Sequence, residues 1–279
     1  MFAAETSSVG AIATALRRRD TYLGHAREAA NLAKCVASYP KGVFERAITF
    51  GPATGDGSHD TPVLLVHGFG HNRSAWFVLE RELRNAGFTC VQTFNYNPFR
   101  HDVPEIAARL KARVELVRAV SGAEKVHLVG HSLGGVVSRW LVQELDGAGM
   151  VESVVTVASP NLGTPAAHLA QLVGRRTARQ LLPGSDVVQR LNAKPLPSSI
   201  RWVAYYSNLD LLVPGDSAKL PGASNLLAKD HGHVSILLSR KVARSIVHQL
   251  EASESVRGIG TARSAAPKYE LAVDAAAGS

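Results

Sequence analysis

The feature that most constrains the fold is an abrupt change of hydrophobic pattern within residues 125–142, KVHLVGHSLGGVVSRWLV. A short apolar run of the kind that forms a buried strand (125–130) passes, without a spacer, into a segment with helical character. The turn between them holds Ser132, with Gly130 and Gly134 two positions away on either side. So tight a turn brings both flanking positions against backbone, where a Cβ atom would clash. The pattern predicts a strand–turn–helix unit with Ser132 in a strained conformation at its apex.

Short apolar runs and amphipathic segments alternate along most of the chain. The runs typical of buried strands lie at 62–68, 88–96, 125–130, 152–159 and 200–207, with a further candidate strand at 43–50. The segments with helical spacing lie at 74–87, 103–122, 133–147 and 233–252. Strands that alternate with helices are typical of a mostly parallel sheet with helices on both faces. The sequence therefore predicts the α/β class.

This alternation divides the 279 residues into three parts. We expect residues 1–42, which are Ala-rich and carry no motif, to be a helical extension. Residues 43–252 are predicted to form one α/β domain, interrupted at about 160–199 by an insertion that we interpret as a small cap. Residues 253–279 are rich in Ala, Ser and Gly and lack apolar periodicity, so we expect a disordered tail.

The chain is basic, with a formal net charge of +8. Such a charge favours contact with nucleic acid or with anionic membrane surfaces. No nucleic-acid-binding motif accompanies the basic residues, so we expect no nucleic-acid partner and interpret them as a solvated face. Peripheral membrane contact stays open, and nothing in the sequence indicates an oligomeric state. The two cysteines, Cys35 and Cys90, do not make a disulfide framework, and we expect Cys90 to be a buried free thiol.

The sequence shows no membrane-spanning or secretory segment. It lacks a run of about 18 apolar residues, the length needed to cross a bilayer. The mildly apolar stretch 9–16 is followed, rather than preceded, by Arg17, Arg18 and Arg19, which reverses the order of a secretion signal. We therefore expect a cytoplasmic protein. A misassigned start codon would hide a signal, and the protein would then be secreted.

Three motifs give the chain a resemblance to a known family. They are VLLVHGFG (63–70), VGHSLGG (129–135), and the late pair YYSNLD (205–210) with GHVSIL (232–237). Through these motifs, the chain from about residue 60 to about residue 250 resembles the α/β-hydrolase superfamily and, within it, the bacterial lipases and esterases. The run ASPNLGTP (158–165) also resembles a segment of the lipases. The resemblance implies the α/β-hydrolase fold, with Ser132 as the nucleophile of a strand–helix elbow.

A serine hydroxyl becomes a good nucleophile only when a base takes its proton, and histidine does this best near neutral pH. The histidines that follow Ser132 are His168, His231, His233 and His248. His168 lies in the insertion and His248 lies deep in the last helical segment. The Gly-His pattern of the family falls on residues 232–233, so the resemblance favours His233 as the base, with His231 as the alternative.

An acidic residue must hold the histidine tautomer and offset the charge of the imidazolium. In the family the acid follows one of two strands. After the strand at 152–159 the chain reads Ser159-Pro160-Asn161, without a carboxylate, whereas YYSNLD ends in Asp210. We therefore predict Asp210 as the acid. The alternatives are less well placed, since one lies in the insertion and two lie beyond the strand end: Asp186, Asp216 and Asp230.

Acyl transfer develops a negative charge on oxygen, so hydrogen-bond donors must be in place to receive it. One predicted donor is the backbone N–H of Leu133, the residue after the nucleophile. By resemblance, the second is the N–H of Phe69 in the short loop after the first strand. The nearby His67 and His71 do not sit where the base belongs, and we interpret them as structural.

We expect no cofactor and no metal. The HGH run could hold a metal as a His-x-His pair, but no third ligand stands at a suitable spacing. Scattered Asp residues leave a structural calcium site open, although nothing marks one. For the substrate, the insertion carries apolar side chains that share helical faces, and we predict that Leu162, Leu172 and Leu182 contact an acyl chain.

These residues predict a cofactor-independent serine hydrolase, a lipase or esterase that cleaves carboxylic esters of apolar acyl chains. Its substrate would be a small-molecule or lipid ester. An acyltransferase or an amidase on the same fold is the alternative within the same chemistry. The alternative of a different class is a non-catalytic binding protein, because a fold alone does not prove an activity.

Overall fold

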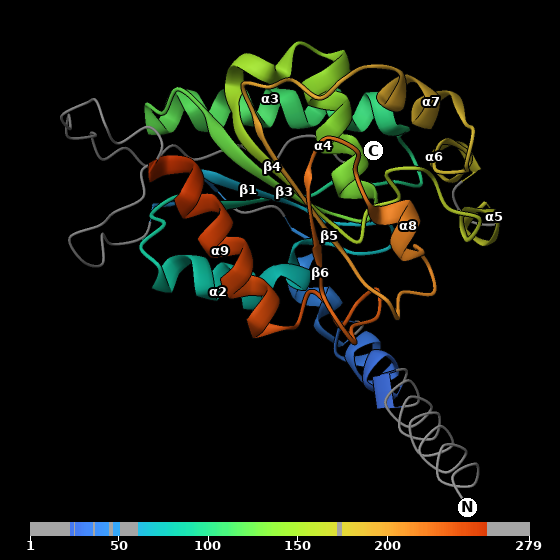
Figure 1. Ribbon diagram of the computed structural model, residues 1–279. Coiled ribbons are helices and arrows are strands. Elements are labelled where there is room, and N and C mark those ends of the chain that lie inside the picture. The colour runs from blue at the N-terminus through green and yellow to red at the C-terminus, as the bar shows by residue number, and fades with distance from the viewer. Residues whose placement is uncertain are drawn as a thin grey trace, which may run out of the picture.

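The computed structural model describes six stretches of the chain: residues 23–24, 26–35, 37–44, 47–50, 61–171 and 175–255. These residues form one six-stranded sheet. Its strands are β1 (Val63–Val66), β2 (Val91–Phe94), β3 (Val126–His131), β4 (Val151–Val157), β5 (Arg201–Tyr206) and β6 (Ser224–Leu227). All neighbouring strands are parallel, in the order β2-β1-β3-β4-β5-β6 (Figure 1). The predicted fold class is confirmed.

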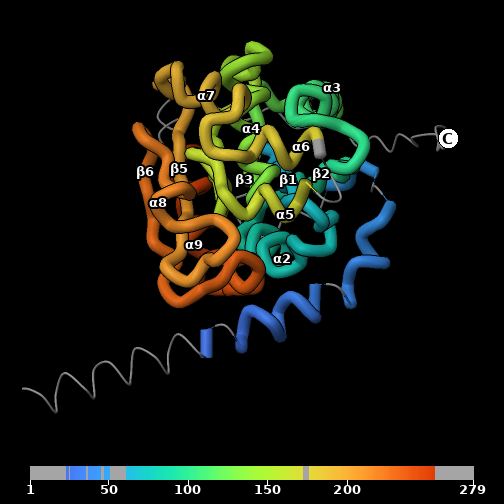
Figure 2. The backbone as a smooth tube through the Cα atoms, turned by 90° about the vertical axis from the view of Figure 1, so that its right-hand side faces the viewer, coloured from blue at the N-terminus to red at the C-terminus, as the bar shows by residue number. Residues whose placement is uncertain are grey.

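Helices cover both faces of the sheet. On one face lie α3 (Val103–Ser121) and α4 (Leu133–Glu144), which pack against each other (Figures 1 and 2). On the other face lie α2 (Phe77–Asn85), which follows the short helix η2 (Arg73–Trp76), and α9 (Arg240–Ser255). The short helix η3 (Gly147–Met150) leads into β4.

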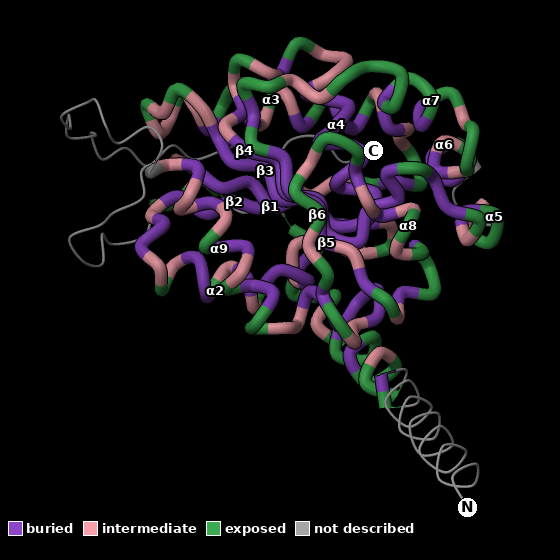
Figure 3. Tube along the Cα trace, in the orientation of Figure 1, coloured by how far each residue is buried: buried purple, intermediate pink, exposed green. Residues whose placement is uncertain are grey.

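Strands β1 to β4 are among the most deeply buried parts of the molecule (Figure 3). Every residue of β1, β2 and β3 is buried. In β1, Leu64 and Val66 join the apolar core that includes α3 and α4, whereas Val63 and Leu65 join the core that includes α2 and α9. Strands buried on both faces are apolar at every position instead of every second one. This is why the run at 62–68 was recognisable as a strand in the sequence.

The ends of α3 follow local sequence signals. Asp102 caps its N-terminus, where its carboxylate accepts the N–H of Glu105 and the Glu105 carboxylate accepts the N–H of Asp102. Gly122 ends the helix in the left-handed conformation, with φ 73°. The expected helix at 103–122 therefore forms with nearly the expected bounds.

The last helix begins later than expected. We predicted a helix over 233–252, but α9 starts at Arg240 and residues 233–238 form turns. Ser239 marks the start, because its hydroxyl accepts the N–H of Val242. The apolar side chains before it, Val234, Ile236 and Leu237, are buried in these turns, so their spacing resembled that of a helix without forming one.

The candidate strand at 43–50 is not a strand in its described residues, which are 43–44 and 47–50. Side chains of the body, instead of a sheet ladder, satisfy several carbonyls of this region and of the preceding η1 (Tyr39–Gly42). Asn72 donates to the carbonyl of Tyr39, and Arg73 donates to the carbonyls of Lys41 and Phe44. The segment is thus held by long-range polar contacts that no local pattern announces.

The region after β4 carries short helices. They are α5 (Ala167–Ala170), α6 (Arg175–Gln180) and α7 (Asp186–Ala193), and α8 (Gly215–Ala218) follows β5. Because β4 and β5 are parallel, these segments leave the sheet at its carboxyl end, where α5 and α8 lie in Figure 1. Buried Arg139 of α4 secures the region by donating to the carbonyls of Asn161 and Leu191.

Two sequence expectations bear on residues with little or no description. The helical character expected for residues 1–22 and most of the expected disordered tail, 256–279, lie outside the described residues.

Strand β6 was not predicted, because this short edge strand is polar at its start and largely exposed. Among the described stretches, no helix is both long enough and apolar enough to cross a membrane.

Candidate active site

Ser132 occupies a strained turn between β3 and α4, with φ 52° and ψ −122°. A Cβ atom on Gly130 would lie 2.5 Å from the carbonyl carbon of Gly134, and one on Gly134 would overlap the carbonyl oxygen of Val66. Only glycine fits at these two positions, as the sequence indicated. The Ser132 N–H donates to the carbonyl of Val157 at 2.9 Å, which ties the turn to the end of β4.

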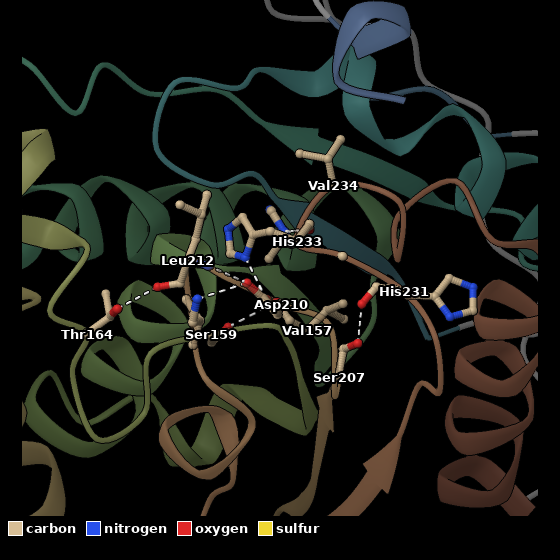
Figure 4. Close-up of polar contacts among 12 residues, drawn as sticks. Val157, Ser159, Thr164, Ser207, Asp210, Leu212, His231, His233 and Val234 are labelled. Atoms are coloured by element: carbon tan, nitrogen blue, oxygen red, sulfur yellow. Dashed lines mark hydrogen bonds and ion pairs between the residues drawn. The ribbon is translucent and has the colours of Figure 1, made fainter. Parts of the chain in front are cut away.

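An aspartate and a histidine meet at the carboxyl end of the sheet. Asp210 follows β5, and its Oδ2 lies 2.8 Å from Nδ1 of His233 (Figure 4). Both side chains are buried, with exposed fractions of 1% and 9%. The other carboxylate oxygen accepts the N–H groups of Leu212 and Val213 at 2.9 and 2.8 Å. This arrangement requires the proton on Nδ1 of His233 and leaves Nε2 able to accept a proton.

The other carboxylates considered for the acid lie elsewhere. Asp216 is exposed and pairs with Lys219. Asp230 accepts a hydrogen bond from the Asn208 amide. Asp186 is the first residue of α7. After β4, where a second acid position was considered, the buried Asn161 amide donates to the carbonyl of Ala218 at 2.7 Å.

The other histidines considered for the base also lie elsewhere. The Nδ1 of His231 lies 2.7 Å from the carbonyl oxygen of Lys229. Its ring points away from Asp210 in Figure 4, and its own carbonyl accepts the Ser207 hydroxyl. His168 and His248 are exposed. Of the four histidines considered, the structure brings His233 to the carboxylate of Asp210.

The two predicted amide donors flank the elbow. Leu133 is the first residue of α4, so its N–H has no partner within the helix. Phe69 lies in the loop after β1, and this loop approaches the elbow so closely that a Cβ on Gly68 would lie 3.0 Å from Cβ of Ser132. Phe69 also packs edge-on against Phe99, with ring centroids 5.1 Å apart. The fold therefore brings both residues to the region of Ser132.

His67 fixes this loop as a neutral hydrogen-bonding group. Burial lowers its pKa to about 4, so the ring carries one proton at neutral pH. Its Nε2 accepts the N–H of Tyr96 at 3.3 Å, which leaves Nδ1 to donate to the carbonyl of Gly68 at 2.9 Å. The ring also stacks on Tyr96, with centroids 4.2 Å apart. Both nitrogens have partners, in agreement with a structural interpretation of this histidine.

His131, next to the nucleophile position, has a contact that sequence reasoning missed. Burial holds its pKa well below the ordinary value, with a further contribution from nearby His233. The neutral ring donates from Nε2 to the carbonyl oxygen of His233 at 2.9 Å. It lies between the rings of His71 and His233, at centroid distances of 5.6 and 4.7 Å. The pKa of His71 is likewise lowered to about 4, chiefly by burial.

Comparison with known proteins places this geometry in a family. Residues 63–245 match the model of the alpha/beta hydrolase family. The chain belongs to this family. It is also 33% identical over 118 residues to triacylglycerol lipases of Pseudarthrobacter phenanthrenivorans and Burkholderia plantarii. Each match covers 39% of this chain, and it spans only about a third of each relative, 36% and 32% respectively.

Solved structures agree with this member of the family in fold. The mature form of Bacillus licheniformis lipase BlEst2 aligns with a TM-score of 0.63 and 20% identity, over 72% of this chain and 96% of that chain. A monoacylglycerol lipase of Paleococcus ferrophilus aligns with a TM-score of 0.55 and 18% identity, over 76% of this chain and all of that chain (100%). At such identities the likeness establishes the fold.

A cavity of about 380 Å³ opens above the elbow. Ser132 and His233 both line it, together with Phe69 and His71. Its remaining wall is mostly apolar and comes from several parts of the chain. The contributors are Leu32, Cys35 and Tyr39 of the N-terminal segment; Gly70 and His131; Pro160, Thr164, Ala166, Ala167, Leu169, Ala170 and Leu181; and Leu212, Val213 and Val234.

The leucines predicted to contact substrate differ from those that line the cavity. Leu162 is 40% exposed and lies outside the wall, and Leu182 packs against the core. Leu172 lies outside the described residues. Leu169 and Leu181 of the same insertion line the cavity instead. The insertion is the expected source of apolar side chains, but the phase of its short helices could not be read from spacing alone.

The contribution of the N-terminal segment was not anticipated at all. Its lining residues Leu32, Cys35 and Tyr39 follow a spacing of i, i+3 and i+7, the pattern of one helical face. That pattern was the available signal. It could not be linked to the site, because the local sequence does not indicate which part of the fold such a helical face packs against.

Proposed function

We propose that the chain is a serine hydrolase that cleaves carboxylic esters of apolar acyl chains. The observation that carries the proposal is the joint position of Ser132 and His233 on one apolar cavity, with His233 held by buried Asp210. Nucleophile, base and acid thus come from the ends of β3, the turns before α9 and the end of β5. Their order in the chain is the order used by α/β hydrolases.

The proposed reaction has two halves. Ser132 Oγ attacks the ester carbonyl while Nε2 of His233 takes its proton, and Asp210 stabilises the imidazolium that forms. The N–H groups of Leu133 and Phe69 stabilise the negative oxygen of the tetrahedral intermediate. His233 then protonates the departing alcohol, which leaves an acyl-serine. Water, deprotonated by His233, attacks the acyl group, and Ser132 is regenerated when the carboxylic acid product departs.

The cavity supports an apolar acyl group as the bound half of the ester. Its volume of about 380 Å³ lies within the range of small-molecule sites. Each methylene that enters such a cavity stabilises the complex by about 0.8 kcal/mol until the space is full. We therefore expect medium-chain esters to be cleaved faster than acetates. The triacylglycerol lipases that match this chain support an ester substrate, although each match covers only about a third of those proteins.

Labelling by a fluorophosphonate, followed by peptide mapping, tests the proposal. The reagent phosphonylates a serine that is activated by its base, so Ser132 should be modified in the wild-type protein and unmodified in Ser132→Ala. Turnover of p-nitrophenyl esters of C2, C4, C8 and C16 acids supplies the second readout. A folded protein that neither labels at Ser132 nor cleaves any of these esters would point to a non-catalytic binding protein.

A further inference from the structure

The N-terminal helix, defined here as residues 26–35, lies outside the segment that matches the family model, residues 63–245. It nevertheless contacts the turn that carries His233. The Glu28 carboxylate accepts the N–H of Val234 on Oε1 at 2.6 Å and the N–H of Ser235 on Oε2 at 2.8 Å. The two donors are the residues that follow His233 directly. This contact joins positions more than 200 residues apart in the chain, since Glu28 and Val234 are separated by 206.

A carboxylate that receives two consecutive amides constrains the backbone strongly. Hydrogen bonds to a charged acceptor are about twice as strong as those between neutral groups. Each oxygen of Glu28 takes one amide, so the orientation of both peptide groups is set by a single side chain. Because the peptide between His233 and Val234 is one of them, the contact restrains the backbone from which the His233 ring projects.

Gly232 makes room for this carboxylate. A Cβ atom at that position would overlap the carboxyl carbon and one carboxylate oxygen of Glu28. Gly232 has no unusual backbone conformation, since it is absent from the glycines with positive φ. The glycine before the histidine is thus explained by space for Glu28, and not by a turn that only glycine can adopt.

Other side chains hold the same turn from its remaining sides. His131 donates to the carbonyl of His233 at 2.9 Å, and the Ser235 hydroxyl accepts the N–H of Gly232 at 2.7 Å. These two groups belong to the matched domain, whereas Glu28 does not. The N–H groups of Val234 and Ser235, which follow His233, therefore depend for their hydrogen bonds on Glu28 of the N-terminal helix.

We propose that Glu28 is a positioning residue for His233, so that the N-terminal helix is part of the catalytic apparatus. The inference rests on the proposed role of His233 as the general base. A displacement of about 1 Å in a catalytic group costs up to about 100-fold in rate. Loss of one or both amide contacts therefore lowers the rate of proton transfer from Ser132, while the cavity that binds the acyl chain keeps its walls.

The test compares Glu28→Gln with Lys34→Gln. Both substitutions remove one charge from the same helix and leave a glutamine, but Lys34 is exposed. The main readout is the second-order rate constant of Ser132 phosphonylation, in which Ser132 Oγ displaces fluoride from phosphorus and its proton passes to His233. We expect this constant, and kcat for p-nitrophenyl butyrate, to fall about tenfold in Glu28→Gln. KM should stay within about twofold, and Lys34→Gln should behave like the wild type.

The final extent of labelling separates positioning from folding. If Glu28 served only the fold, Glu28→Gln would reduce the fraction of molecules that label, and the folded fraction would react at the wild-type rate. That result, or a rate constant within twofold of the wild type, would overturn the proposal. A wild-type protein that does not label at all would instead overturn the proposed function.

A double-mutant cycle with Gly232 gives an independent check. Gly232→Ala alone should slow phosphonylation, because its methyl group displaces the carboxylate of Glu28. In the Glu28→Ala background the obstacle is gone, so Gly232→Ala should cause little further loss. Additive losses would show that Gly232 serves a purpose unrelated to Glu28, and this would remove that support from the assignment.

Discussion

Asp210 uses only one of its two carboxylate oxygens for His233. Oδ2 lies 2.8 Å from the ring Nδ1, while Oδ1 accepts the N–H groups of Leu212 and Val213. The backbone of its own loop thus fixes the carboxylate independently of its contact with His233. The insertion in turn holds this loop, because Thr164 donates to the carbonyl of Leu212 at 2.5 Å (Figure 4).

Asp210→Asn should therefore lower kcat strongly and leave the fold intact. The amide can still accept the two backbone N–H groups, but its NH₂ group would face Nδ1 of His233 and favour the wrong tautomer. We expect a loss of about 10⁴ in kcat, with little change in the free energy of unfolding. Asp216→Asn, at an exposed position, is the control. Equal sensitivity of Asp216→Asn would place the acid in α8 instead.

Ser132→Ala should abolish ester hydrolysis without loss of structure. Removal of the nucleophile of a catalytic unit costs about 10⁶ in rate. The residue is a small side chain at a turn with φ 52°, so a methyl group fits in place of the hydroxymethyl group. Turnover of p-nitrophenyl butyrate and circular dichroism supply the two readouts. Activity within tenfold of the wild type would contradict the assignment of the nucleophile.

His233→Ala should be as damaging as Ser132→Ala, whereas His231→Ala should be mild. The two histidines are separated by one residue, but only His233 meets the carboxylate of Asp210. We expect a loss of about 10⁶ for the first variant and less than tenfold for the second. Steady-state kcat values for both proteins decide the matter. The reverse ranking would assign the base to His231.

Leu169→Ser should change the preference for acyl chain length, and Leu162→Ser should not. Both leucines belong to the insertion and both are exposed, at 72% and 40%, but only Leu169 lines the cavity. Loss of apolar contact worth two or three methylenes corresponds to a loss of about tenfold or more in kcat/KM for a C8 ester. Acetate should be cleaved at nearly the wild-type rate. A C8-to-C2 ratio that both variants alter equally would exclude the cavity as the acyl site.

Stability should fall as the pH is lowered from about 6.5 towards 4. The pKa values of His67 and His71 are about 4 in the folded protein and about 6.5 in an unfolded chain. The unfolded state therefore binds more protons in this window, and stability increases with pH across it. Each group contributes up to roughly 3 kcal/mol, present above pH 6.5 and lost as the pH falls to 4. Urea unfolding at pH 7 and 4.5 measures the effect.

His71→Phe is the matched variant for this pH effect, because it keeps a ring of similar size and removes one titrating group. The free energy of unfolding of His71→Phe should depend less on pH than that of the wild type. An unchanged pH dependence would show that His71 is not neutral in the folded protein.

Much of the fold was predictable because the parts that matter are local. The Gly130-x-Ser132-x-Gly134 pattern predicts the elbow, and the apolar runs of β1 and β3 predict the buried centre of the sheet. The start of α9 was misplaced because Val234, Ile236 and Leu237 are apolar and buried without being helical. Apolar spacing reports burial, and the turns around His233 satisfy the same spacing.

The missed features depend on contacts between distant segments. Glu28 binds amides 206 and 207 positions away, and Leu32 lines a cavity whose walls outside the N-terminal segment begin at Phe69. A glutamate and a leucine in an Ala-rich helix carry no local mark of either contact. The same holds for Leu162 and Leu169, which only the packing of the short insertion helices distinguishes.

In the proposed mechanism, the neighbouring strands β1 and β3 position the reacting groups, whereas other segments shape the cavity that selects the substrate. They run side by side in the sheet, although η2, α2, β2 and α3 stand between them in the chain, and their ends bring the Phe69 loop and the Ser132 turn together. In that mechanism, the spacing of the nucleophile and the oxyanion donors is therefore set by two fully buried strands of the sheet. Much of the apolar cavity wall comes from the N-terminal segment and the insertion. Exchange of these peripheral segments between relatives would retune substrate range while the reacting centre is inherited unchanged.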